Sequence, residues 1–188
     1  MKIIYEYSHL GGGEILQLRY ADTLAKIYEV VSLVEPRTAK ISKEKTKIGR
    51  NLVSPKDLNS GFKERFTERG FHELRDKYTI TIPNSPTRIR GAFKQVDFVK
   101  DLVLVEVQFG KYAFMFYDMA KFQYFFNQNQ ANVGVEIVPC NTLKRRMSSG
   151  VSYGEQLVYD IERLKRTFPA VPVLVILIDS DVATPTTE

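Results

Sequence analysis

Residues 97–108, DFVKDLVLVEVQ, decide the fold of this chain. Two apolar runs flank Lys100-Asp101, which is the pattern of two strands joined by a tight turn. In the second run, valines alternate with a row of side chains that begins apolar and turns polar at Glu106. Glu106 and Gln108 point the same way because side chains along a strand repeat every two residues. The stretch therefore predicts a β-hairpin with a polar corner.

The polar corner of this hairpin holds two acids. Asp97 ends the first arm, and Glu106 lies on the second arm, where the turn can bring the two side by side. Converging carboxylates suit Mg²⁺, which is bound by one or two of them together with water and phosphate oxygens. Such an ion neutralises a phosphodiester, lowers the pKa of a bound water and stabilises the leaving oxygen. The alternative is that both acids are ordinary surface residues of a sheet.

The rest of the chain predicts helices alternating with strands. Residues 37–50 predict an exposed basic loop or a short helix, and residues 142–151 predict a polar loop. Helices between the later strands imply a mixed sheet covered on both faces, so the fold class is α/β. We expect one domain over residues 1–180 and a disordered tail over 181–188. Apolar spacing predicts helices at 21–34, 54–70, 112–126 and 153–165, and further strands at 78–82, 133–138 and 173–178.

Composition limits the possible functions. The chain has 188 residues, 44% of them hydrophobic, which is enough for a packed core. Its net charge of +5 weakly favours a polyanionic partner. The single cysteine, Cys140, excludes an intrachain disulfide and a cysteine-rich zinc site. The first residues lack the apolar run of a signal peptide, and the longest apolar stretch, 171–178, is too short to span a bilayer. These features indicate a soluble cytoplasmic protein without a membrane partner.

The hairpin resembles the PD-(D/E)XK nuclease core. In more detail, Asp97-Phe98 and residues 105–109 are similar to the active-site hairpin of the BglII and BstYI group of restriction endonucleases, where glutamine also replaces the usual lysine. The chain departs from the group in a shorter segment between Tyr78 and Asp97 and in a short extra tail. Other stretches similar to BstYI follow in order along the chain, at 7–10, 42–47, 110–112, 134–137, 147–150 and 169–172.

The resemblance implies roles for individual residues. Asp97, Glu106 and the Val107 carbonyl would bind Mg²⁺, and water would attack phosphorus in line, leaving a 5′-phosphate and a 3′-hydroxyl. Gln108 would stand in the catalytic position of the lysine, although an amide carries neither charge nor a transferable proton. Glu73 would be a further catalytic acid. The alternative for Glu73 is a solvated acid that follows a helix.

The resemblance also implies a double-stranded DNA substrate with a GATC-centred palindrome, expected to be purine-GATC-pyrimidine. A palindrome requires a homodimer with two-fold symmetry. A cognate methyltransferase would protect the host DNA without being a physical partner. Lys111, Ser148 and Ser149 would contact bases, although a flexible turn or a helix cap is the alternative for the two serines. Phosphate contacts would come from Lys144, Arg145 and Arg146, and from the basic run 40–50 unless that run is a solvated loop.

Three competing functions remain open at this point. A repair or junction-resolving nuclease on the same core would cut unrelated DNA sequences at similar rates. A catalytically inactive DNA-binding relative is compatible with Gln108, although the presence of both Asp97 and Glu106 argues against it. A basic protein-interaction module would show no DNA affinity that weakens with salt.

Overall fold

The computed structural model describes residues 1–36, 38–45, 47–164 and 167–180. The tail predicted to be disordered, 181–188, lies outside these ranges, as do Arg37 at the start of the basic segment and Lys165 at the end of the last predicted helix. No helix among the described residues is long and apolar enough to cross a membrane.

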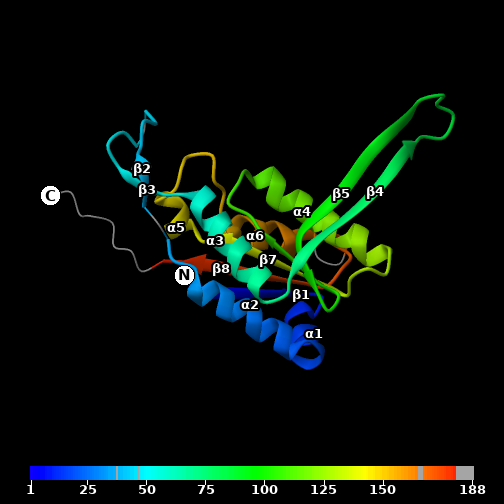
Figure 1. Ribbon diagram of the computed structural model, residues 1–188, viewed down its shortest axis with the longest axis horizontal. Helices are drawn as coiled ribbons and strands as arrows, with labels where there is room; N and C mark the ends of the chain where they lie inside the picture. The colour runs from blue at the N-terminus through cyan, green and yellow to red at the C-terminus, as the bar shows by residue number, and fades with distance from the viewer. Residues whose placement is uncertain (37, 46, 165–166, 181–188) are drawn as a thin grey trace.

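A six-stranded sheet forms the centre of the molecule (Figure 1). Its last three strands in the chain run parallel, and the other three are antiparallel to their neighbours. The three parallel strands are almost wholly buried, because both faces of the sheet are covered, and most of their residues are apolar. This confirms the predicted mixed α/β sheet. In spatial order the strands are β1 (Lys2–His9), β8 (Val173–Asp179), β7 (Val133–Pro139), β6 (Val103–Val107), β5 (Arg88–Lys100) and β4 (His72–Thr81).

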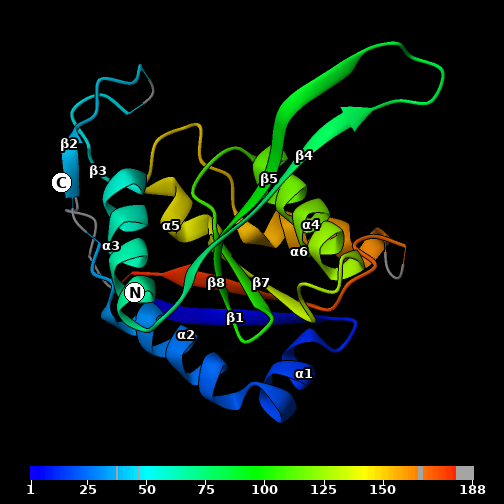
Figure 2. The ribbon, with the colours of Figure 1, turned by 45° about the vertical axis from the view of Figure 1, so that its right-hand side comes forward.

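Helices cover both faces of this sheet (Figure 2). On one face lie α1 (Gly12–Arg19), α2 (Ala21–Leu33) and α3 (Pro55–Glu68), and on the other lie α4 (Tyr112–Asn127), α5 (Asn141–Arg145) and α6 (Gly154–Leu164). The contact of Phe66 with Phe98, at 4.6 Å between ring centroids, fixes α3 on the first face. A second, two-stranded sheet pairs β2 (Thr38–Ile41) with β3 (Asn51–Val53).

The predicted hairpin is β5 followed by β6, and its turn lies one residue later than expected. Lys100 pairs with Val103, so Asp101 and Leu102 form the turn, with φ angles of 49° and 64°. Positive φ at both central positions is the geometry of a type I′ turn, whose twist matches that of paired strands. The Thr23 hydroxyl on α2 donates a 2.7 Å hydrogen bond to Asp101 Oδ2 and ties the turn to the helix layer.

Several elements differ from the expectations. Strand β2, which pairs with β3, lies in the segment 37–50 predicted as a loop or a short helix, and most of the short helix α5 lies in the predicted loop 142–151. The N-terminal β1 and α1 were not predicted. Strand β4 begins at His72, so Glu73 lies within a strand rather than after a helix. Beyond the sheet, β4 and β5 continue as a long projecting ribbon (Figures 1 and 2). Strand β1 pairs with β8 at the other end of the described chain, and local patterns do not reveal such a partner.

Gly134 sets how closely α4 approaches β7. A Cβ atom at this position would lie 2.5 Å from Cδ2 of the buried Phe122. We therefore expect Gly134→Ala to lower the free energy of unfolding by about 1–3 kcal/mol, measured by urea denaturation. Gly61→Ala is the matched control, because its Cβ would meet Val34 at an ordinary 3.5 Å. Equal stability of the two variants would contradict this close approach.

Candidate active site

A row of acidic side chains crosses four neighbouring strands. Phe98 pairs with Val105 across the hairpin, so Asp97 and Glu106 occupy the next opposite positions and point to the same face. Glu106 in turn pairs with Glu136 on β7. Gly134 and Glu136 share one side of β7, and Gly134 faces Phe122 of α4, so the row faces α4. The hairpin therefore brings the two predicted metal ligands together.

Glu73 extends the row at its outer end. The register of β4 and β5 shifts between His72 and Leu74, which marks an irregularity opposite Asp97. Bulges of this kind re-aim side chains and are common beside active sites. Glu73 Oε2 accepts a 2.7 Å hydrogen bond from Gln95 Nε2, and Gln95 lies two residues before Asp97 on the same side of β5. This geometry places Glu73 beside Asp97.

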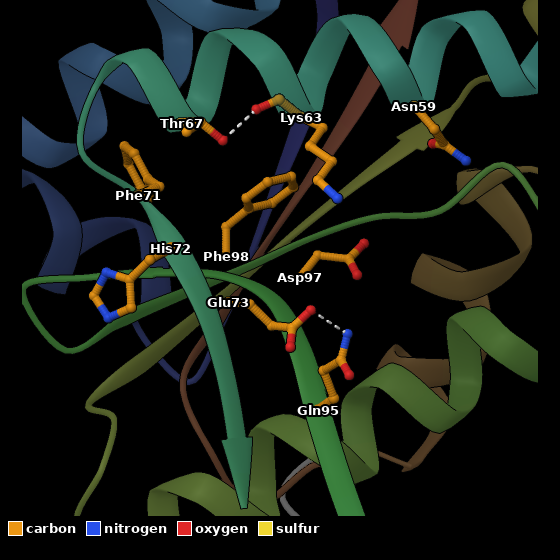
Figure 3. A pocket seen from close by; sticks show the side chains of 9 residues that line it. All are labelled: Asn59, Lys63, Thr67, Phe71, His72, Glu73, Gln95, Asp97 and Phe98. Atoms are coloured by element: carbon orange, nitrogen blue, oxygen red, sulfur yellow. Dashed lines mark hydrogen bonds between the residues drawn. The ribbon is translucent and has the colours of Figure 1, made fainter.

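An open cavity of about 360 Å³ lies against these acids (Figure 3). Glu73, Gln95 and Asp97 line it from the strands, and Lys63 reaches toward it from α3. Asp97 is exposed, whereas Glu106 is 2% exposed. The row therefore runs from an open cavity on β4 and β5 into the protein interior on β6 and β7.

Glu106 is held by a cation from the helix above it. Lys121 Nζ on α4 donates to Glu106 Oε1 and lies 2.7 Å from Asp118 Oδ1. Asp118 Oδ2 also accepts a 3.0 Å hydrogen bond from Gln108 Nε2. A Cβ atom on Gly110 would lie 2.6 Å from Gln108 Oε1, so the glycine leaves room for this amide. Four polar side chains thus form one connected network beneath α4.

Burial and like charges shift the pKa values of this network. Burial raises the pKa of Glu106 well above its usual range, and the nearby carboxylates of Asp118 and Asp97 raise it further. Burial likewise raises the pKa of Asp118. For Lys121, burial works to lower the pKa, but the two carboxylates outweigh it and the pKa is raised. The site is therefore short of positive charge and would be stabilised by a bound cation.

Glu136 is a fully buried acid at the inner end of the row. Its side chain is 0% exposed, and neither carboxylate oxygen has a hydrogen-bond partner among the described residues. Burial raises the pKa of Glu136 well above its usual range, and the carboxylates of Asp118 and Glu106 add to the effect. Glu136 is thus a buried acid that favours its protonated form.

The donor set fits a hard divalent cation. Among the described residues, no group of three His, Cys, Asp or Glu side chains is arranged to hold a metal ion by itself. Mg²⁺ needs fewer protein ligands, because one or two carboxylates suffice when water and phosphate oxygens complete its shell. Asp97 and Glu106 supply the carboxylates, and Val107, the last residue of β6, follows with its carbonyl. All of these donors are oxygen atoms.

A family model described as restriction endonuclease BglII/BglIII matches residues 4–178. The chain belongs to the BglII family of restriction endonucleases. It is a type II site-specific deoxyribonuclease, as predicted from the hairpin. A comparison with curated proteins finds no match.

Two solved structures of BglII share the fold of this family member. A crystal structure of restriction endonuclease BglII complexed with a DNA 16-mer aligns with a TM-score of 0.72 and 23% sequence identity, covering 97% of this chain and 79% of that one. A structure of free BglII aligns with a TM-score of 0.68 and 21% identity, covering 98% and 82%.

The two segments expected to read DNA bases are linked by a backbone hydrogen bond in this BglII-family enzyme. Lys111 is the exposed N-cap residue of α4. The loop that carries Ser148 and Ser149 is joined to the turn before α4 by a 2.9 Å hydrogen bond from Ser152 N to Gly110 O. This bond anchors the end of the serine loop at Gly110, which follows Gln108 and precedes Lys111.

The basic segment packs against this same loop. Lys47 Nζ donates to Met147 O, and Glu44 Oε2 accepts a 3.0 Å hydrogen bond from Ser149 N. The backbone N–H of Val53 also donates a 2.7 Å hydrogen bond to the carbonyl oxygen of Arg146. The structure thus joins two segments that the sequence suggested separately as DNA contacts.

The three basic residues of α5 and its C-cap differ in their surroundings. Arg145 is exposed, and Lys144 Nζ lies 5.8 Å from the centroid of the Tyr153 ring. Arg146 is directed inward, where its guanidinium pairs with Asp179 and donates a 3.0 Å hydrogen bond to Ser180 O. This inward placement argues against Arg146 as a phosphate contact.

Sequence reasoning missed Asp118, Lys121 and Glu136. The first two stand three residues apart in a helix interpreted as a Met and aromatic core stripe, and Glu136 interrupts an apolar strand. The signal was present, since a charged residue on a buried face needs a partner or a purpose. Helical spacing could have shown that Asp118 and Lys121 share a face with the core residues.

The unpartnered Glu136 leads to a pH-dependent prediction. A raised folded-state pKa means that the folded protein keeps this proton to higher pH than the unfolded chain does. Stability is therefore lost as pH rises from the ordinary value of about 4.5 through the raised one. We expect Glu136→Met to increase the free energy of unfolding at pH 8 by about 1–3 kcal/mol, with a smaller gain at pH 5.

Urea denaturation at both pH values measures the effect. Glu64→Met, at an exposed position on α3, is the matched control and should leave the pH dependence unchanged. A loss of stability in Glu136→Met at pH 8 would show that this acid has a stabilising partner after all.

Proposed function

We propose that this enzyme is a Mg²⁺-dependent endonuclease that cuts double-stranded DNA at a GATC-centred palindrome, as a homodimer in the cytoplasm. The observation that carries the proposal is the opposite placement of Asp97 and Glu106 across the hairpin. It is supported by membership of the BglII family and by the DNA complex solved for BglII itself.

In this proposal the carboxylates of Asp97 and Glu106 and the carbonyl of Val107 hold the ion. When bound, Mg²⁺ supplies charge neutralisation of the phosphate and acidification of water. Gln108 cannot transfer a proton or add charge, and its amide is engaged with Asp118. Its role is therefore to hold the Asp118 carboxylate in position, and this carboxylate also contacts Lys121. Glu73 borders the open cavity beside Asp97, where it can orient the attacking water.

Base contacts are assigned to the segments around the start of α4. Lys111 can donate to the O6 and N7 acceptors of guanine, and the serine hydroxyls can either donate or accept. Serine also tolerates either base of a degenerate outer pair, which suits purine-GATC-pyrimidine. A palindrome presents the same half-site to each of two identical subunits, so the dimer has one active site per strand. Lys144, Arg145 and the basic segment provide phosphate contacts.

Plasmid digestion tests the proposed specificity. The purified protein should cut plasmid DNA into discrete fragments with Mg²⁺ and should leave it intact with EDTA. Sequencing of the ends should give 5′-phosphates and GATC overhangs within a purine-GATC-pyrimidine site. Cutting of unrelated sequences at similar rates would identify a non-specific nuclease. Salt-sensitive DNA binding without cleavage would identify an inactive DNA-binding relative.

The metal ligands have their own test. Asp97→Ala and Glu106→Ala should reduce the rate of plasmid cleavage by at least about a thousandfold, because each removes a ligand of the ion that stabilises the transition state. DNA affinity, measured by fluorescence anisotropy with Ca²⁺, should be retained. Asp22→Ala, at an exposed position in the first turn of α2, is the matched control and should cleave normally. Retained cutting by either active-site variant would refute the site.

Lys111 is predicted to contact DNA bases rather than phosphates. Lys111→Ala should lose roughly 5- to 150-fold in cleavage of GATC-centred sites, the equivalent of one good base contact. Its affinity for a duplex without such a site should change far less. Competition anisotropy with the two duplexes measures both values, and an equal loss for both would reassign Lys111 to a phosphate contact.

A further inference from the structure

The carboxylate network beneath α4 contains a built-in cation. Lys121 contacts both Glu106 Oε1 and Asp118 Oδ1, and its side chain is 13% exposed. The two acids are 2% and 1% exposed. All three charges are therefore largely removed from water.

Core packing does not explain a lysine at this place. Apart from Asp118, the buried side chains of α4 are apolar, and they pack the helix against the sheet without a charge. A buried ion pair contributes little or no net stability compared with apolar residues of similar size, because both charges lose their hydration. The acids that Lys121 contacts therefore explain why a lysine occurs at this position. The apolar set consists of Met115, Met119, Phe122 and Phe125.

The acids outnumber the cation. Glu106, Asp118 and Glu136 are all buried on the α4 side of the sheet, and Asp97 adds a further carboxylate at the open end of the row. Lys121 is the ammonium that contacts two of them. Glu106 Oε2 has no hydrogen-bond partner among the described residues, so one oxygen of the proposed metal ligand is free.

We propose that Lys121 is the internal counter-ion of the metal site. In the metal-free protein its ammonium neutralises Glu106 and holds it next to Asp118. A divalent cation bound by Asp97 and Glu106 would share the Glu106 carboxylate with Lys121 and would be repelled by the ammonium. The lysine therefore stabilises the empty site and weakens the affinity for the ion. This is a positioning and charge-balancing role that acts through Glu106, and it rests on the proposed function.

The inference predicts opposite effects on the empty and the metal-bound protein. Lys121→Met should lower the Tm in EDTA at pH 8 by roughly 6–20 °C, because two buried carboxylates lose their cation. The same variant should bind Mn²⁺ at least about tenfold more tightly than the wild type, since a repelling charge within a few ångströms is gone. Addition of Mn²⁺ should therefore raise its Tm by more than that of the wild type.

Asp118→Asn removes a negative charge from the network and keeps the size of the side chain, so it tests charge without changing the packing. This variant removes one anion and should bind Mn²⁺ more weakly than the wild type. The double variant Lys121→Met with Asp118→Asn removes one charge of each sign, so its affinity should return close to that of the wild type. It also provides a folded protein if the single lysine variant does not fold. Lys56→Met, at an exposed position in the first turn of α3, is the control for loss of a distant positive charge.

Isothermal titration calorimetry with Mn²⁺ in the absence of DNA measures these affinities, and thermal unfolding with and without Mn²⁺ measures the stabilities. Tighter binding by Lys121→Met, with the double variant near the wild type, supports the counter-ion. Equal or weaker binding by Lys121→Met, together with normal binding by the wild type, overturns the inference and leaves the proposed nuclease intact. Absence of saturable binding by the wild type instead overturns the metal site itself.

Discussion

The pairing of Asp97 with Glu106 across one hairpin is the constraint on which the rest of the site depends. The two acids are nine residues apart in the sequence, and the register of β5 and β6 puts them opposite one another. A type I′ turn at Asp101-Leu102 fixes that register. A slip of one residue would turn one acid to the opposite face of the sheet and separate the two proposed metal ligands. The function of the site is therefore set by the geometry of a two-residue turn.

The buried acids of the site reduce the stability of the folded protein. Glu106 and Asp118 are buried with one lysine between them, and Glu136 is buried with no partner among the described residues. Each of these acids has a raised pKa because burial disfavours its charged form. Buried acids with shifted pKa values are typical of active sites, where a ligand can compensate their charge. The apolar strands and the close approach of α4 to Gly134 provide the rigidity that keeps the acids in place.

The sequence predicted those parts of the molecule that depend on local patterns. The hairpin, the helix α3 and the buried strands β7 and β8 follow from periodicity and turn chemistry. The position of β1 against β8 and the inward direction of Arg146 toward Asp179 arise from contacts between distant segments. The role of Asp118 and Lys121 was hidden because an apolar stripe dominates α4. Only the packing of this helix against β5 and β7 brings their charges onto Glu106.

A crystal structure of the protein soaked with Mn²⁺ and bound to a DNA duplex tests the central claim most directly. The anomalous difference map should show a Mn²⁺ peak within about 2.5 Å of carboxylate oxygens from both Asp97 and Glu106, with a phosphate oxygen in the same coordination shell. A metal peak held by other residues, or carboxylates that stay apart with no metal between them, would contradict the assignment of this hairpin as the catalytic centre.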